Sequence, residues 1–570
     1  MIKDLLTPEK IQQIKSNLFF DDFFDYINKL IEENKDNPCP DLPYSAYRLF
    51  VETGDRQQFE TPYFLRRRML MAYAIRYIFD RNPEDLAVLQ DIIWETCGEF
   101  AWSVPAHIAN DVKNSDPYCA RTYIDLFASE TGASIAEIYS ILKDEFEPRI
   151  NERIVYELND RIINPYINNY FFFEGGGNNW TGVCCGSIGI TMLYIAPEKL
   201  NLFKDRLLTP LSRYLATFGE SGICEEGISY WNYGFSNYIY FADMLKEYSK
   251  GRVNILNIPR AETVATFGCN AYIRKNHTIS YSDGSHSFHY NIGLNHFLAD
   301  TFEKAYPLDP AFCDKKLPSF FKDAIRTLLW TNENYLDAKE LPLVTTEEYD
   351  SKIGWYINKK AKYSFTAKAG HNEESHNHND LGNFIICTDN GQQVIDFGAG
   401  YYNKNYFRIP QRYEEQIIAC SRGHNVPIIN GVIQKHGRIY SATATKHSNN
   451  VFALDLSKAY PDCGMTAYNR EFVLDEDSVK LSDKISFTAD KNTVNEHFIS
   501  YAQPEICGNV INIGETTLVC PANCQFNIIC EQVRSHLFRE ELQNYNTIYI
   551  TEVVFDCGKE FEAEFTLKIN

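Results

Sequence analysis

The segment FIICTDNGQQVID, residues 384–396, contains two runs that are typical of β-strands, with a turn between them. Residues 384–387 and 393–396 are rich in β-branched and aromatic side chains, and Asn390-Gly391 suits a tight hairpin turn. Similar short runs predict strands over residues 478–486, 526–530, 548–555 and 562–569. Many short strands separated by turn signals favour an antiparallel β-sandwich in the C-terminal part of the chain.

The preceding part of the chain has the pattern of successive helices. Asn82-Pro83-Glu84-Asp85 supplies a cap, a first-turn proline and acidic residues ahead of apolar residues at helical spacing. A second helix is predicted from Pro197 to Gly219, and the sequence shows no short-period repeat of a helical solenoid. We therefore predict a multidomain α+β protein with a helical domain over residues 1–340 and a β-sandwich over 341–570, joined near 341–350.

Composition narrows the classes of function. The 570 residues include 55 Lys+Arg and 76 Asp+Glu, a formal charge of −21, which argues against nucleic acid or an anionic membrane as the main partner. No apolar run reaches the ~18–20 residues of a membrane span, and the N-terminus lacks the apolar core of a secretory signal. The 16 cysteines form no C-x-x-C pair, so we expect reduced thiols and a cytoplasmic protein.

The densest polar cluster begins at His371 and continues through His376 and His378 to Asp380. Two histidines two residues apart in extended structure point to the same side, and Asp396 and His424 follow at predicted strand ends. Imidazole nitrogens and a carboxylate are ligands that suit zinc. The sequence thus predicts a cation site, the alternative being that these polar residues only cap turns at the ends of the sheet.

Two further polar and aromatic clusters lie in the helical part. Residues 174–184 contain three successive glycines followed by Asn178, Asn179 and Trp180, and residues 225–234 contain EEGISYWNYG. Glycines allow close approach of the backbone to a ligand, amides offer hydrogen-bond donors, and aromatic rings offer flat faces to sugars. Because the chain has 37 tyrosines, most of them must be packing or surface residues.

In combination, these segments resemble the heparinase II/III-like polysaccharide lyases, including related alginate lyases. The resemblance rests on G-N-N-W-x-x-V-C, E-G-x-S-Y-W-x-Y-G, S-H-x-H-x-D-x-G-x-F with V-I-D-F-G, and S-x-x-H-N, in the family's order over residues 174–430. It implies an incomplete (α/α) toroid followed by an antiparallel β-sandwich, with the active cleft between them. It also implies β-elimination at a uronic acid, which leaves a 4,5-unsaturated sugar.

The resemblance also implies roles for individual residues. Asn179, with Asn178 as a second candidate, would neutralise the uronate carboxylate, which makes the C5 proton acidic enough to remove. Tyr233 and His376 match the proton-transfer residues, and Tyr233 would need a lowered pKa to act as a base. His378, Asp396 and His424 match the ligands of a structural zinc, and no organic cofactor is implied. Where many relatives carry histidine after the motif asparagine, this chain has Trp180.

We expect an anionic uronate oligosaccharide or polysaccharide as the partner. Glycosaminoglycan fragments are favoured over alginate. Arginine is the best receptor for carboxylate or sulfate groups. The predicted substrate-binding residues are Asn178, Trp180, Glu226, Tyr230, Trp231, Arg408, Arg412 and Arg422. The sequence leaves open whether the protein forms a homo-oligomer.

Other readings of these residues stay open as well. A glycoside hydrolase on the same fold would need an acid pair, for which Glu225 and Glu226 or Glu373 and Glu374 are available. A non-catalytic glycan-binding protein and an iron-dependent, cupin-like site are further alternatives. The long helical part of the chain argues against the cupin-like site.

Overall fold

The computed structural model describes residues 1–111, 119–338, 345–535 and 545–570. Two compact units divide the chain. The first comprises residues 1–217, 231–269 and 289–339, and the second comprises residues 218–230, 270–288 and 340–570. The predicted boundary between residues 340 and 341 lies outside the described residues. In the described ranges, no helix is both long and apolar enough to cross a membrane.

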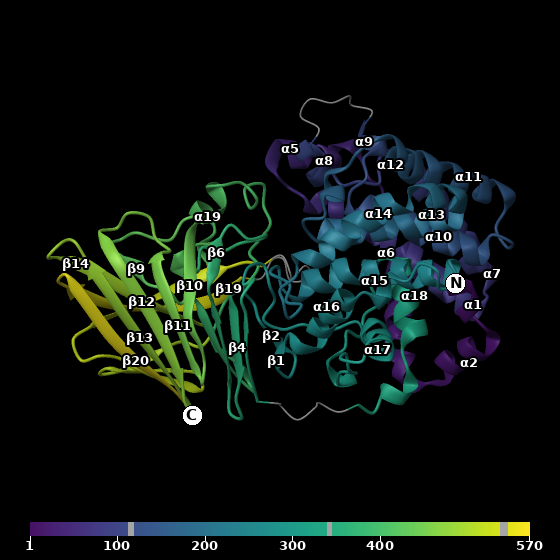
Figure 1. Cartoon of the computed structure of the whole chain (residues 1–570). Coiled ribbons are helices and arrows are strands. Elements are labelled where there is room, and N and C mark those ends of the chain that lie inside the picture. The colour runs from purple at the N-terminus through teal and green to yellow at the C-terminus, as the bar shows by residue number, and fades with distance from the viewer. Residues whose placement is uncertain (112–118, 339–344, 536–544) are drawn as a thin grey trace. The chain divides into compact units, whose positions relative to one another are not determined.

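The first unit consists of helices (Figure 1). Helix α15 contributes its first three residues to the second unit and the remainder to the first. The helices are α1 (Ile2–Leu5), α2 (Pro8–Ser16), α3 (Asp21–Asn34), α4 (Tyr44–Tyr47), α5 (Leu49–Thr53), α6 (Gln57–Asp80), α7 (Pro83–Gly98), α8 (Pro105–Asp111), α9 (Cys119–Thr122), α10 (Leu126–Leu142), α11 (Pro148–Leu158), α12 (Asn164–Asn168), α13 (Asn179–Ile195), α14 (Pro197–Thr217), α15 (Ile228–Tyr248), α16 (Pro259–Asn270), α17 (Ile292–Thr301) and α18 (Phe321–Trp330).

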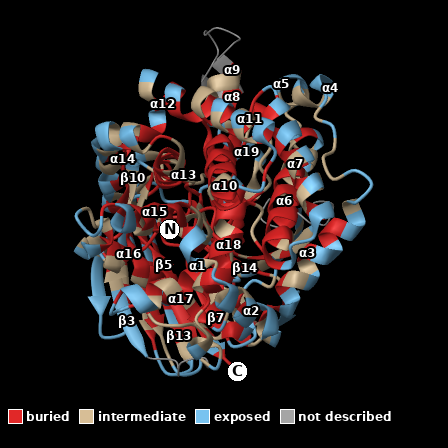
Figure 2. Cartoon of the chain, turned by 90° about the vertical axis from the view of Figure 1, so that its right-hand side faces the viewer, coloured by how far each residue is buried: buried red, intermediate tan, exposed pale blue. Residues whose placement is uncertain are grey.

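The capping signals correctly predict where α7 and α14 begin. The Asn82 side chain accepts a hydrogen bond from the Glu84 amide (3.0 Å), and α7 starts at Pro83. Helix α14 starts at Pro197 as expected. Helix α10 is buried along nearly its whole length, so that it forms the interior of the first unit (Figure 2).

The second unit contains the described strands, all paired antiparallel within their sheets. One sheet has nine strands in the order β15-β16-β17-β20-β13-β12-β11-β10-β6, another has β18-β19-β14-β9, a third has β3-β4-β5-β7-β8, and β1 pairs with β2. The strands and the one helix among them are β1 (Tyr272–Arg274), β2 (His277–Thr278), β3 (Thr346–Asp350), β4 (Trp355–Lys359), β5 (Ser364–Lys368), β6 (Gly370–Asn372), β7 (Phe384–Thr388), β8 (Gly391–Val394), α19 (Gln411–Glu415), β9 (Ile428–Ile429), β10 (Gly437–Ser448), β11 (Val451–Lys458), β12 (Met465–Leu474), β13 (Ser478–Phe487), β14 (Asn492–Ser500), β15 (Glu505–Cys507), β16 (Val510–Ile513), β17 (Thr516–Val519), β18 (Gln525–Val533), β19 (Asn546–Cys557) and β20 (Glu560–Ile569).

An aromatic core joins the sheets into a sandwich. Phe365 of β5 packs against Phe472 of β12 at 5.0 Å, and Phe384 of β7 packs against Phe498 of β14 at 6.3 Å between ring centroids. The predicted hairpin over residues 384–396 is present, but its two-residue loop is Asp389-Asn390, and β8 begins at Gly391. The predicted antiparallel β-sandwich is thereby confirmed.

Buried ion pairs cross the interior of each unit. Each joins elements that are distant in sequence or lie on different strands, and each side chain involved is at most 3% exposed. A buried charge without its partner costs several kcal/mol, so each pair has to form as the unit folds. The pairs are Arg67–Glu99 (2.5 Å), Arg326–Glu137 (2.6 Å), and Arg470 with Asp483 (2.7 Å) and Glu496 (2.9 Å).

Glycines allow α13 and α15 to pack backbone against backbone. A Cβ atom added at Gly182 would lie 2.5 Å from the Gly234 carbonyl oxygen, and one at Gly186 would overlap the carbonyl of Asn237. These contacts are too short for any side chain. The same packing fixes the start of α13, where the predicted site residue Asn179 lies.

We expect Gly186→Ala to lower the free energy of unfolding by about 1–3 kcal/mol, because the added methyl group overpacks a rigid backbone contact. Gly98→Ala is the matched control, since a Cβ atom there meets nothing within 4 Å. Denaturant unfolding of both variants measures the effect. Equal stability of the two would contradict the close packing of α13 and α15.

Candidate functional site

In the second unit, the buried carboxylate of Asp283 lies at the centre of a polar cluster around His376. Oδ2 accepts hydrogen bonds from His376 Nδ1 (2.5 Å) and from the Tyr402 hydroxyl (2.8 Å). Oδ1 accepts from Arg412 Nη2 (2.9 Å) and from the Tyr406 hydroxyl. His376 is thus held by one ring nitrogen, and no polar atom among the described residues bonds its Nε2.

The charges in this cluster stabilise one another. Burial alone would raise the pKa of Asp283, but Arg412 and His376 outweigh it and hold that pKa well below its usual value. Burial lowers and Asp283 raises the pKa of His376, with a net increase. His376 also has a φ of 57°, in the left-handed region that few non-glycine residues adopt, and not the extended conformation expected from the sequence. The imidazole is therefore oriented by Asp283 and made more basic.

Tyr230 and Glu226 lie in the same unit. The Tyr230 hydroxyl is 2.5 Å from the Tyr402 hydroxyl, and its ring centroid is 4.5 Å from that of His376. Burial raises the pKa of Tyr230 well above its usual value and that of Glu226 to about 7. A protonated tyrosine and a glutamic acid that is about half protonated at neutral pH therefore accompany the histidine.

The three predicted metal ligands come together. One potential ligand atom from each of His378, Asp396 and His424 lies within 4.8 Å of the others, and all three residues are buried. His378 Nδ1 and His424 Nε2 are buried without a hydrogen-bond partner among the described residues. The other nitrogen of each ring faces a carboxylate, His378 Nε2 that of Asp283 (3.1 Å) and His424 Nδ1 that of Asp396 (3.2 Å). Two orphaned lone pairs beside a carboxylate fit a bound cation.

The first unit holds Asn179 and Tyr233. Asn179 is the first residue of α13 and is 6% exposed. The Tyr233 hydroxyl donates a hydrogen bond to Glu130 Oε2 (2.7 Å). Burial and the neighbouring Glu130 raise the pKa of Tyr233 well above its usual value, which is opposite to the shift that a catalytic base needs. Burial raises the pKa of Glu130 to about 7, although Lys322 opposes this.

Other predicted substrate-binding residues have structural contacts. Asn178 caps α13 by accepting a hydrogen bond from the Trp180 amide (3.2 Å). Trp231 is 4% exposed, and its indole N–H donates to the Val264 carbonyl (2.8 Å). Arg412 is buried on Asp283, whereas Arg408 and Arg422 are exposed. Of the three arginines, only these last two present a solvent-accessible guanidinium.

Sequence reasoning missed Asp283, Tyr402 and Tyr406. Asp283 lies 93 residues before His376 in a short turn between β2 and α17, and none of the four motifs includes it. The two tyrosines lie in an irregular segment between β8 and α19. The only sequence signal was the presence of three tyrosines, Tyr401, Tyr402 and Tyr406, shortly after the V-I-D-F-G motif.

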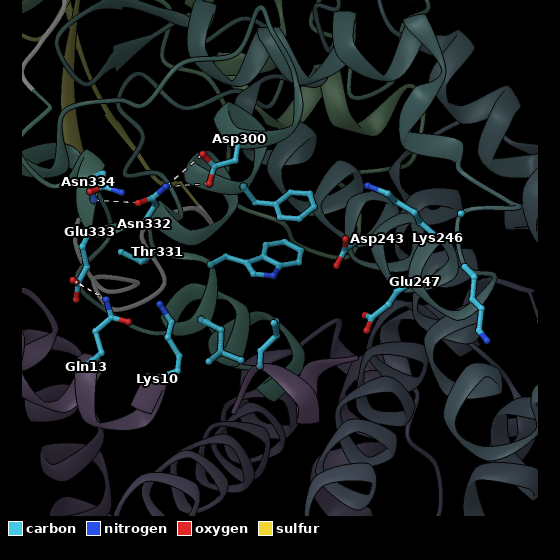
Figure 3. A pocket seen from close by; sticks show the side chains of 16 residues that line it. Lys10, Gln13, Asp243, Lys246, Glu247, Asp300, Thr331, Asn332, Glu333 and Asn334 are labelled. Carbon is cyan, nitrogen blue, oxygen red and sulfur yellow. Dashed lines mark hydrogen bonds between the residues drawn. The ribbon is translucent and has the colours of Figure 1, made fainter. Parts of the chain in front are cut away.

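A cavity of about 850 Å³ in the first unit contains none of the predicted site residues. Asn332 bonds Asp300 on one side of it, and Asp243 lies with Lys246 and Glu247 on another (Figure 3). Its lining includes both acidic and basic side chains, so it does not select an anionic ligand by charge. The cavity therefore adds nothing to the candidate site.

A second buried carboxyl group lies close to the His376 segment. Glu374 is 3.6 Å from Lys368, which also pairs with Asp380 at 2.7 Å. Burial raises the pKa of Glu374 from 4.5 to about 8, despite the opposing effect of Lys368. The folded state therefore favours the protonated acid, and this contribution to stability is present below pH 4.5 and lost as the pH rises through about 8.

We expect Glu374→Gln, which imitates the neutral acid, to gain at least about 1 kcal/mol more stability relative to the wild type at pH 9 than at pH 5. Glu373→Gln is the control, because that neighbouring side chain is 52% exposed. Denaturant unfolding at both pH values measures the difference. A gain that is the same at pH 5 and pH 9 would show that Glu374 is already ionised in the folded protein.

Comparison with solved structures identifies proteins of similar fold. A mutant of the heparan sulfate lyase HepC from Pedobacter heparinus is 11% identical, covering 100% of this chain and 88% of that one, with a TM-score of 0.61. Heparinase III is 12% identical, covering 90% and 78%, with a TM-score of 0.63. The chondroitin AC lyase of Streptomyces coelicolor A3 is 9% identical, covering 100% and 82%, with a TM-score of 0.58.

No family model and no curated protein sequence matches the chain. At identities of 9–12%, the similarity to these lyases is one of fold. It confirms the predicted helical toroid followed by an antiparallel β-sandwich. The chain therefore has the fold of the heparinase III-type polysaccharide lyases.

Proposed function

We propose that this protein is a polysaccharide lyase that cleaves uronic-acid-containing glycans, of the glycosaminoglycan type rather than alginate, by β-elimination. The observation that supports it best is the His376 imidazole, which Asp283 holds at Nδ1 while Nε2 stays unbonded among the described residues. An imidazole oriented in this way is suited to accept a proton from carbon. The fold shared with solved lyases supports the same assignment.

In the proposed reaction, a base removes the C5 proton of the uronate and the C4–O bond breaks. The electron pair of the C5–H bond forms the C4=C5 double bond, and the leaving oxygen takes up a proton. His376 Nε2 accepts the C5 proton, and the negative charge of Asp283 stabilises the resulting imidazolium. The Asn179 amide donates to the uronate carboxylate and stabilises the charge that develops there.

A tyrosine would protonate the leaving oxygen. We assign this role to Tyr233, and its raised pKa favours an acid over a base. Tyr230 is the alternative, because its ring lies beside His376 in the second unit and its pKa is also raised. Glu226, with a pKa of about 7, could serve as the acid of a glycoside hydrolase, but such an enzyme forms no unsaturated product.

We also propose that His378, Asp396 and His424 hold a zinc ion. Zinc would supply structural rigidity to the segment that carries His376, because His378 is only two residues away. The chemical step itself is assigned to the side chains of the protein.

We expect Asn179→Ala, Tyr233→Phe and His376→Ala each to lower kcat by about a hundredfold or more, since each removes a proton-transfer or charge-stabilising group. The measurement is the ultraviolet absorbance of the unsaturated uronate released from a panel of glycosaminoglycan and alginate oligosaccharides. Tyr230→Phe is the matched control for Tyr233→Phe.

A large loss in Tyr230→Phe with little loss in Tyr233→Phe would move the acid role to Tyr230. If none of the variants changed the rate of product formation on a substrate that the wild type turns over, the mechanism would be wrong. Substrate cleavage without an unsaturated product would favour the hydrolase instead.

Zinc should stabilise the chelator-treated protein against heat, because an ion that binds only the folded state adds to its stability. His424→Ala should remove this stabilisation, whereas His447→Ala, on strand β10 outside the three-residue group, should retain it. Thermal unfolding with and without zinc tests this together with metal analysis of untagged protein. Trace metal content and no zinc-dependent shift in the wild type would refute the zinc site.

A further inference from the structure

His107 of α8 is held by a buried aspartate in the first unit. Its Nδ1 lies 2.7 Å from Asp125 Oδ2, and Asp125 is fully buried. The same carboxylate accepts hydrogen bonds from the Val104 amide (3.1 Å) and the Ala128 amide (2.7 Å), the second of which caps α10. Because Asp125 is fixed by two backbone groups, it also fixes the orientation of the imidazole.

Aromatic rings hold the faces of the same imidazole. It stacks on Phe127 with 5.2 Å between ring centroids and an angle of 25°, and it contacts Trp180 at 4.9 Å. Trp180 in turn packs against the exposed ring of Phe172 at 4.8 Å. The imidazole therefore has little rotational freedom left to lose when a ligand binds.

The second ring nitrogen of His107 is available. The side chain is 14% exposed, and no polar atom among the described residues bonds Nε2. Because Asp125 engages Nδ1, Nε2 is the ring nitrogen left for a ligand, and it donates a hydrogen bond when it carries a proton.

The location connects His107 with the proposed reaction. Its neighbour Trp180 directly follows Asn179 in the first turn of α13. In the proposed mechanism, Asn179 supplies only a neutral amide to the uronate carboxylate. A second hydrogen-bond donor beside that turn would add to the stabilisation of the anionic intermediate.

We propose that His107 is a further substrate-binding residue, which donates from Nε2 to the carboxylate of a uronic acid sugar. The ligand class is a sugar acid within an oligosaccharide, and the inference rests on the proposed function. Trp180 of α13 occupies the position after the motif asparagine, and it contacts the imidazole of His107, which comes from α8.

The test compares two hexasaccharide probes, unsulfated chondroitin and the same oligosaccharide with its carboxyl groups reduced to alcohols. Binding is measured on the full chain carrying His376→Ala, so that the probe is not consumed. Without further changes, this protein should bind the acidic probe at least about tenfold more tightly than the reduced one. Adding His107→Gln should reduce that preference about tenfold and leave affinity for the reduced probe unchanged.

His289→Gln is the matched control, since His289 is an exposed histidine of the first unit. Thermal unfolding of both histidine variants checks that the fold is retained, and His107→Asn serves as a second variant if His107→Gln unfolds. In the otherwise unaltered enzyme, His107→Gln should also lower kcat/KM for the acidic probe.

If the acidic preference and kcat/KM survive in folded His107→Gln and His107→Asn, the role of His107 is refuted while the lyase assignment stands. If the wild type neither cleaves nor binds unsulfated chondroitin, unsulfated heparan-type or alginate hexasaccharides, the proposed function fails and the role of His107 fails with it.

Discussion

The negative charge of Asp283 is the interaction on which the polar cluster of the second unit depends. A carboxylate that is 0% exposed would be strongly unfavourable alone, and it is stable here because donors surround it. These donors come from three separate chain segments: His376 and His378, Tyr402 and Tyr406, and Arg412. One buried charge therefore aligns the proposed proton acceptor and one of the three residues suited to hold a metal.

The first unit uses the same physical principle. Asp125 caps α10 and holds His107, and five residues later Glu130 accepts a hydrogen bond from Tyr233 and forms an ion pair with Lys322 (3.0 Å). Both acids lie at the start of the most deeply buried helix of the unit. Helix α10 is buried along nearly its whole length, and the Val104 and Ala128 amides fix Asp125 at its start, so both acids are held on a rigid element.

Local signals in the sequence predicted much of the fold. The cap at Asn82, the proline at Pro197 and the alternating strands act over a few residues, so they could be recognised directly. A His/Asp/His cation site was expected from the residue types and the predicted strand ends, and the family resemblance named His378, Asp396 and His424. The structure brings these three together. Asp283 could not be found, because its role arises from contacts that span 93 residues. Trp231 was predicted to bind sugar, but contacts with residues distant in sequence, such as Val264, bury it in the fold.

The buried ion pairs also constrain how this sequence can diverge. Replacing Arg470 alone would leave Asp483 and Glu496 as two uncompensated charges within the sandwich, while replacing all three by apolar residues of similar volume would be tolerated. Homologous sequences should therefore either retain Arg470, Asp483 and Glu496 together or replace all three together. Such concerted exchange lowers sequence identity without altering the backbone, which offers a physical route to proteins that share this fold at identities near 10%.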